Sequence, residues 1–87
     1  MDANLNLSRL GNELRGRRTA RGITQAELAR RTRLSRALVI RAEQGDTTVS
    51  IGNFAKLLGA IGSELVVETA RRPTLSEAAE LFADDNA

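Results

Sequence analysis

The stretch that decides the fold of this chain is residues 22–45, GITQAELARRTRLSRALVIRAEQG. It contains two helix starts. Thr24 is followed three residues later by Glu27, which predicts a capping box in which each side chain satisfies a free backbone N–H of the first turn. Ser35 is a second N-cap, and Gly45 offers a left-handed stop. Two short capped helices joined by a tight corner predict a helix-turn-helix.

The two expected helices cover residues 25–31 and 36–43. Helical spacing separates an inner face from an outer one. The inner face holds Leu28, Ala29, Val39 and Ala42. The outer side of the second helix holds Arg36, Ala37, Ile40 and Arg41. The second helix therefore presents both charged and apolar groups to a partner.

The composition describes one small globular domain. The chain has 87 residues, of which 41% are hydrophobic and 28% charged. It contains no Cys and no His, which removes thiolate ligands, disulfides and the commonest metal ligand and acid–base catalyst. We therefore expect no catalytic residues, no metal and no cofactor, and not an enzyme. No apolar run is long enough for a bilayer span, so a cytoplasmic protein without a membrane partner is expected.

The charge is unevenly distributed along the chain. Residues 9–41 hold ten Arg and two Glu, or +8, whereas residues 42–87 hold three basic and eight acidic residues, or −5. The positive charge thus surrounds the predicted helix-turn-helix. A polyanion such as double-stranded DNA is the expected partner, and a merely solvated cationic face is the alternative.

The remaining segments complete an all-α domain of four to five helices. Residues 1–7 are expected to form a flexible arm, and a first helix should begin near Asn6 or Ser8 and run to about Arg21. A further helix should begin after the cap Ser50 and end at Gly62. The helix-turn-helix domain is then residues 8–62.

Residues 63–70 have a different character. The run Glu64-Leu65-Val66-Val67-Glu68-Thr69 is β-branched and bounded by charge, which predicts a strand. A single strand needs a pairing partner, so we expect Leu65, Val66 and Val67 to form a dimer interface with the same strand of a second copy. The alternative is a β-like tail lying on the helices.

Residues 71–87 form an acidic C-terminal tail or short helix. Thr74 and Glu77 have capping-box spacing, and Leu75, Ala79 and Phe82 follow on one side of a helix. Such a segment packs on its own dimer, binds a partner or frays, and the pattern does not distinguish these.

The motifs of residues 22–29, 34–36 and 43–45 resemble the Cro/repressor (XRE) helix-turn-helix family. The continuation Phe54-Ala55-Lys56-Leu57-Leu58-Gly59-Ala60-Ile61-Gly62, followed by a strand, resembles HipB-type antitoxins in particular. This resemblance implies a lambda-repressor-like homodimer that represses transcription at an inverted-repeat operator and holds a HipA-like kinase toxin. A stand-alone phage- or plasmid-type regulator is the alternative.

The resemblance also implies roles for individual residues. Gln25 and Ser35 contact phosphates, Arg36, Ala37 and Arg41 read bases, and Ile40 meets a thymine methyl group. The full set of implied DNA contacts is Thr24, Gln25, Arg33, Ser35, Arg36, Ala37, Ile40, Arg41, Gln44 and Thr47. Arg18 and Glu43 match a structural ion pair. Position 33 departs from the family, where Gly often provides a left-handed corner, and we expect Arg33 to offset this strain by reaching a phosphate.

Overall fold

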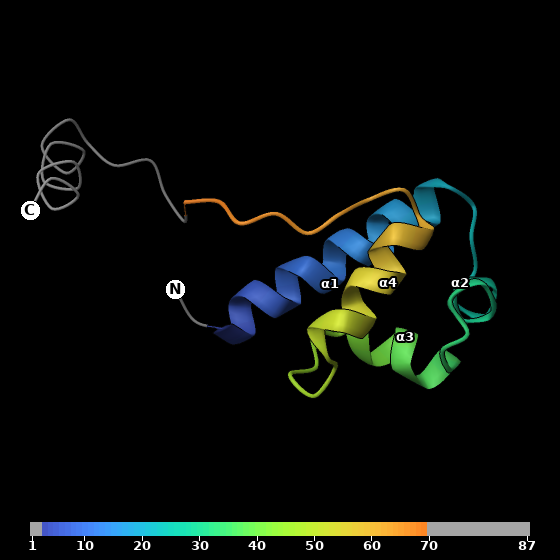
Figure 1. The fold of residues 1–87 in the computed structure, drawn as a ribbon, viewed down its shortest axis with the longest axis horizontal. Coiled ribbons are helices and arrows are strands. Elements are labelled where there is room, and N and C mark those ends of the chain that lie inside the picture. Colours follow the sequence, from blue (N-terminus) through green and yellow to red (C-terminus); the bar gives the residue numbers. More distant parts are fainter. Residues whose placement is uncertain (1–2, 70–87) are drawn as a thin grey trace, which may run out of the picture.

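The computed structural model describes residues 3–69, which form four helices (Figure 1). They are α1 (Ala3–Ala20), α2 (Gln25–Thr32), α3 (Arg36–Glu43) and α4 (Ile51–Ala60). The predicted bounds of α3 are confirmed, and α2 is one residue longer than expected. The placement of the α1 start was wrong, because the helix already includes most of the expected arm 1–7. No Gly or Pro precedes Gly11 to stop it there.

The helices enclose a single apolar core. α2 packs against α3 and α4, and α1 packs against α3. Each helix contributes side chains to the core, and full burial of one large apolar side chain contributes about 1.5–3 kcal/mol. The buried members are Leu14, Ile23, Leu28, Ala29, Val39, Ala42, Phe54, Leu57, Leu58 and Ile61.

All four helices end in the same hydrogen-bonded turn. At each end a residue with positive φ follows the helix, and two backbone N–H groups bond back to carbonyls of the last turn. Three of these residues are glycines, Gly22, Gly45 and Gly62, with φ of 69°, 75° and 72°. The fourth is Arg33, with φ of 59° and ψ of 33°. The left-handed corner expected at position 33 is therefore present without glycine.

Two glycines allow α1 to approach the end of α3. A Cβ on Gly11 would lie 2.5 Å from the carbonyl oxygen of Glu43, and one on Gly45 would lie 2.7 Å from the backbone of Ser8. Gly11, which weakens α1 as an isolated helix, thus serves the packing of that helix. The crossing of α1 and α3 is backbone against backbone.

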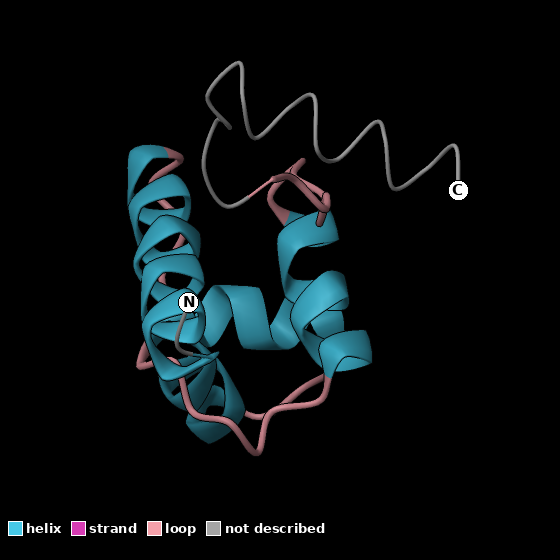
Figure 2. Ribbon diagram, turned by 90° about the vertical axis from the view of Figure 1, so that its left-hand side faces the viewer, coloured by secondary structure: helices cyan, strands magenta, loops and turns pink. Residues whose placement is uncertain are grey.

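The predicted strand at 64–69 is not formed in the described chain, which contains helices and loops only (Figure 2). Residues 63–69 run back along α1 as an irregular segment. Leu65 packs against the core, while Val66 and Val67 are 65% and 102% exposed. A lone strand has no neighbour with which to form a ladder, and this is the physical reason for the difference. The tail 71–87 lies outside the described residues.

Candidate nucleic-acid interface

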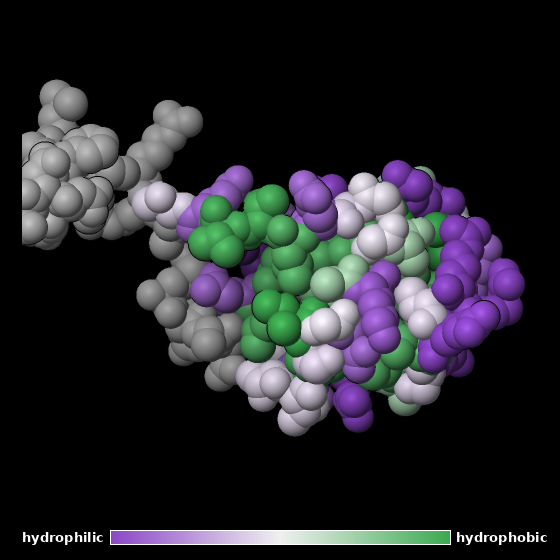
Figure 3. Space-filling view, in the orientation of Figure 1, coloured by the Kyte–Doolittle hydropathy of each residue, from purple (hydrophilic) through white to green (hydrophobic). Residues whose placement is uncertain are grey.

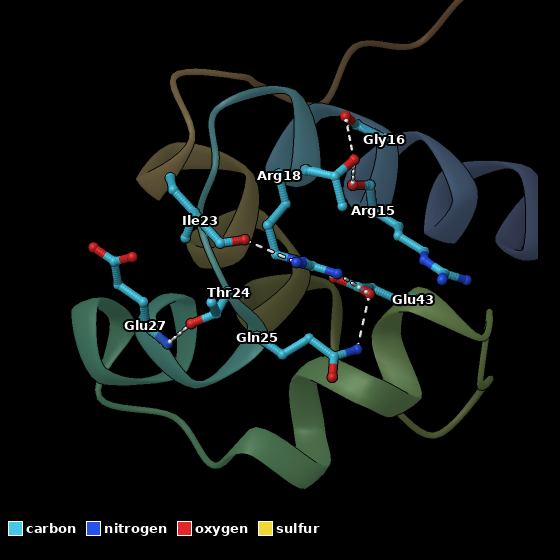
Figure 4. A network of polar contacts seen from close by, with 9 residues as sticks. Arg15, Gly16, Arg18, Ile23, Thr24, Gln25, Glu27 and Glu43 are labelled. Atoms are coloured by element: carbon cyan, nitrogen blue, oxygen red, sulfur yellow. Dashed lines mark hydrogen bonds and ion pairs between the residues drawn. The ribbon is translucent and has the colours of Figure 1, made fainter.

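A buried ion pair joins α1 to the end of α3 (Figure 4). Arg18 Nε donates to Glu43 Oε2 at 2.6 Å, and Arg18 Nη2 donates to Glu43 Oε1 at 3.1 Å. The third guanidinium nitrogen, Nη1, donates to the carbonyl oxygen of Ile23 at 2.8 Å. Both side chains are at least nine-tenths buried. The pair predicted from the resemblance is therefore present and fully hydrogen-bonded, which is the condition for a buried charge pair to be tolerated.

Gln25 is drawn into the same network. Its Nε2 donates to Glu43 Oε1 at 3.1 Å, so one N–H of the predicted phosphate contact is already used inside the protein. The amide nitrogen carries two hydrogens, and the second remains for a ligand. Gln25 thereby links the α2 start to the ion pair, a role that the sequence patterns did not indicate.

The start of α2 presents backbone donors to solvent. Thr24 Oγ1 accepts from the N–H of Glu27 at 3.0 Å, as the capping box predicts. The reciprocal half of the box is absent in the described residues, because the Glu27 carboxylate accepts from Arg31 at 2.6 Å instead. The N–H groups of Gln25 and Ala26 precede any intrahelical acceptor, and such groups bind anions.

The outer side of α3 is open to a partner. Ser35 Oγ accepts from the N–H of Leu38 at 3.0 Å and starts the helix. Arg36 and Ala37 are exposed, and Ile40 is half-buried at its edge. This side of α3 thus combines a cation with two apolar groups. That combination suits major-groove base edges, which offer guanine acceptors and thymine methyl groups.

A sequence profile of the helix-turn-helix domain matches residues 9–83, most of the chain. The chain belongs to the helix-turn-helix domain family. The match supports an XRE-like DNA-binding regulator, in agreement with the geometry of α2 and α3. No curated protein matches the chain in a sequence comparison, and no solved structure matches it either.

The corner of the helix-turn-helix carries Arg33. Its left-handed backbone costs about 1 kcal/mol relative to glycine. The side chain is exposed, so no packing contact in the described chain offsets this strain. Gln44 and Thr47, at the far end of α3, are also exposed. Arg33, Gln44 and Thr47 thus lie on the surface where a ligand can reach them, and their contacts with the DNA backbone stay predictions.

Arg41 lies near an acid that sequence reasoning did not single out. Its Nε lies 4.0 Å from Asp46 Oδ2, and its side chain remains 49% exposed. The other carboxylate oxygen, Oδ1, accepts from the N–H and Oγ1 of Thr48 at 2.8 and 2.6 Å. These Thr48 hydrogen bonds, with a smaller contribution from the charge of Arg41, hold the pKa of Asp46 below 3.8.

Arg15 joins the interface of the helix-turn-helix domain, although sequence reasoning counted only its charge. It lines a shallow hollow together with Thr24, Gln25 and Arg36. The hollow is therefore lined by arginines of α1 and α3 together with the start of α2. Helical spacing could have indicated this position, because Arg15 precedes Arg18 by three residues and so shares its face of α1.

Away from α2, exposed apolar side chains lie among charged ones. Figure 3 shows polar side chains over the end that carries α2, and hydrophobic ones over α4 and the segment after it. Between α1 and residues 63–69 lies a groove of about 510 Å³, lined by both. A smaller apolar hollow of about 170 Å³ lies beside it, with Leu65 and Phe54 in its wall. The groove is lined by charged as well as apolar residues, among them Arg9, Glu13, Glu64 and Glu68.

Residues 3–69 contain neither a membrane span nor a cluster of metal ligands. None of the four helices is long and apolar enough to cross a membrane. No group of three or more Asp or Glu side chains lies close enough together to hold a metal ion in this part of the helix-turn-helix protein.

Proposed function

We propose that this protein is a dimeric, sequence-specific transcriptional repressor that places α3 in the major groove of an inverted-repeat operator. The observation that carries the proposal is the open outer side of α3, with Arg36 and Ala37 exposed beside the free N–H groups of the α2 start. The proposed role is recognition of DNA without chemical catalysis, and it would place the protein in the cytoplasm, at the nucleoid.

Two sets of residues divide the work. The start of α2, with Arg15 and Gln25 beside it, contacts phosphates and sets the position of the domain on the duplex. Arg36 and Arg41 reach base edges, where a bidentate contact to guanine O6 and N7 discriminates by about 1–3 kcal/mol. Arg33 contacts a phosphate next to the corner, and this contact offsets the strain of its backbone.

Residues 64–69 support the dimer. None of their backbone N–H groups donates to another described residue, and Val66 and Val67 are exposed. Asn6 lines the neighbouring groove, and its buried Oδ1 has no hydrogen-bond donor among the described residues. A second copy that pairs its 64–69 segment here satisfies these groups and covers the apolar surface. Its recognition helix then meets a half-site about 34 Å away.

The DNA-binding test uses a single substitution and a matched control. Arg36→Ala is expected to weaken operator binding about tenfold, because one guanine contact is lost. Lys56→Ala removes a cation from α4, outside the proposed interface, and should leave binding within twofold. Footprinting on the DNA upstream of the gene should show a protected inverted repeat. Equal binding by wild type and Arg36→Ala would contradict the proposal.

The dimer has its own test in solution. Val67→Lys places a charge in the proposed strand pair without touching the core, since Val67 is fully exposed in the single chain. We expect sedimentation equilibrium to show a dimer for the wild type and a monomer for the variant, with the same helical circular dichroism. A variant that stays dimeric would rule out pairing through 64–69.

An antitoxin role is the second candidate. It is supported by the resemblance to HipB-type antitoxins and by the exposed apolar side chains of Ile51, Val66 and Val67. The partner would be a HipA-like kinase, and the alternative is a stand-alone phage- or plasmid-type regulator. The neighbouring gene discriminates between them: a kinase reading frame whose product co-purifies with this protein supports the antitoxin, and an isolated gene contradicts it.

A further inference from the structure

We infer that Asp46 determines part of the DNA specificity of this protein, by holding the guanidinium of Arg41 in one orientation at the surface of α3. The inference rests on the proposed function, in which Arg41 reads a base. It assigns a task to an acid that lies at a DNA-binding surface, where a negative charge by itself disfavours binding.

The backbone brings Asp46 next to Arg41. After α3, Gly45 adopts a φ of 75° and its N–H donates to the carbonyl oxygen of Ala42 at 3.1 Å. The N–H of Asp46 then donates to the carbonyl oxygen of Arg41 itself, at 3.0 Å. Gly45 is in turn pressed against the backbone of Ser8 in α1. The relative position of residues 41 and 46 is therefore set by the fold and not by their side chains.

Thr48 orients the carboxylate. Its N–H and its hydroxyl both donate to Oδ1 of Asp46, at 2.8 and 2.6 Å. The second oxygen, Oδ2, is left facing Arg41 Nε at 4.0 Å. Because one oxygen is fixed by two donors, the other has a defined place, and the Nε edge of Arg41 is attracted to it. The Nη groups of Arg41 remain free for a ligand in the described chain.

The two arginines of α3 differ in this respect. Arg36 has no acidic partner among the described residues, whereas Arg41 has Asp46. A bidentate guanine contact needs two coplanar N–H groups at one place, and a long side chain loses rotamer freedom to provide them. Asp46 removes part of this freedom before DNA arrives. It also repels phosphates, so that it discourages Arg41 from turning to the backbone at non-cognate sites.

The experiment separates these effects with two substitutions. Asp46→Asn keeps an oxygen that accepts from Thr48 but removes the charge that faces Arg41. Thr48→Val removes the hydroxyl donor but keeps the charge. Each protein first selects its preferred sequences from a randomised double-stranded DNA library. Binding is then measured on the selected operator, on operators changed at single base pairs, and on unrelated duplex DNA.

We expect Asp46→Asn to lose about tenfold in discrimination at one base pair of each half-site, within the range of a single guanine contact. Binding to unrelated DNA should become about two- to fivefold tighter, because a charge that repels phosphates is gone. Thr48→Val should keep most of the discrimination. In an Arg41→Ala background, Asp46→Asn should not change discrimination further, since the group that it orients is absent.

Other results would overturn the inference. An Asp46→Asn protein that selects the same sequences with the same discrimination shows that Asp46 does not act through Arg41. A variant that binds all DNA more weakly and melts at a lower temperature shows a structural role only. In both results the wild type still selects an operator, so the proposed function survives. A wild type that selects no sequence removes the proposed function as well.

Discussion

The corners before and after α3 have the same backbone but different surroundings. Arg33 and Gly45 both have positive φ, and both form the same pair of hydrogen bonds to the preceding helix. Gly45 lies against α1, where a Cβ would come within 2.7 Å of the backbone of Ser8. Arg33 is exposed to solvent.

The difference shows which part of the glycine requirement is local. A left-handed residue costs about 1 kcal/mol with any ordinary side chain, and the domain tolerates that cost at Arg33. Close packing adds a second cost at Gly45, where no side chain fits. The corner before α3 is thus free to carry an exposed side chain, whereas the corner after it has room only for glycine.

The largest loss of stability is expected from a substitution of Glu43, the last residue of α3, two residues before the packed corner at Gly45. Glu43→Ala leaves the buried guanidinium of Arg18 without its partner, and we expect a loss of about 3–5 kcal/mol in the free energy of unfolding. Urea denaturation measures this loss. The control is Glu27→Ala, which breaks an exposed pair with Arg31 and should cost no more than about 1 kcal/mol. Equal losses would contradict the importance of burial.

A pair of glycine substitutions measures strain and packing separately. Gly45→Ala should destabilise the domain by about 3 kcal/mol, because it adds overpacking to the left-handed strain. Gly22→Ala is the matched control, since Gly22 has a φ of 69° but nothing within 4 Å of an added Cβ. It should cost only about 1 kcal/mol. Thermal unfolding of both variants gives the comparison, and equal effects would show that packing against α1 is unimportant.

Substitutions at Arg33 test the exposed corner. Arg33→Gly should raise the free energy of unfolding by about 0.5–1 kcal/mol, because strain is relieved, while it weakens operator binding severalfold. Arg33→Ala separates the two effects, since it keeps the strained Cβ and removes only the guanidinium. We expect the same loss of binding from both variants but a gain in stability from Arg33→Gly alone. Unchanged binding would show that Arg33 does not reach a phosphate.

The smallest expected effect is a pH dependence at Asp46. Its pKa is lowered in the folded protein, chiefly by the hydrogen bonds from Thr48, so its contribution is present above pH 3.8. The contribution is lost as the pH falls from 3.8 through the lower folded-state value. Urea denaturation between pH 2.5 and pH 5, about this window, should therefore show a shallower slope for Asp46→Asn than for the wild type. Identical slopes would contradict the lowered pKa.

The sequence predicted the local features well. Thr24, Ser35 and Ser50 each cap the helix that was expected to follow. Capping needs only a side-chain oxygen and an N–H two or three residues later, so the information is contained in a few consecutive residues. The left-handed corner at Arg33 was expected from the resemblance to the Cro/repressor family, in which Gly often occupies this position, and not from the residues around it. The start of α1 was not predicted, because Asp2, Asn4, Asn6 and Ser8 are all residue types that cap helices, and the sequence does not choose among them.

The candidate interface was predicted less completely. Glu27 had two local partners, the N–H of Thr24 and the side chain of Arg31, and spacing could not tell which one it binds. The bond from Gln25 to Glu43 joins residues 18 positions apart, and the hollow of Arg15 and Arg36 joins α1 to α3. Such neighbours depend on how the helices cross, which no local pattern specifies.

The sequence by itself determined the helix caps of the helix-turn-helix, because each cap depends on residues within about one turn of each other. It also determined the concentration of positive charge, which is counted directly along the chain. The tertiary structure decided which arginines are committed and which are free. Arg18 is buried against Glu43, Arg41 faces Asp46, and Arg36 is open to solvent. The ten arginines of residues 9–41 cannot be told apart by their charge alone. They differ in the folded protein, where one is buried against a partner, another lies beside an oriented acid and a third is exposed to water.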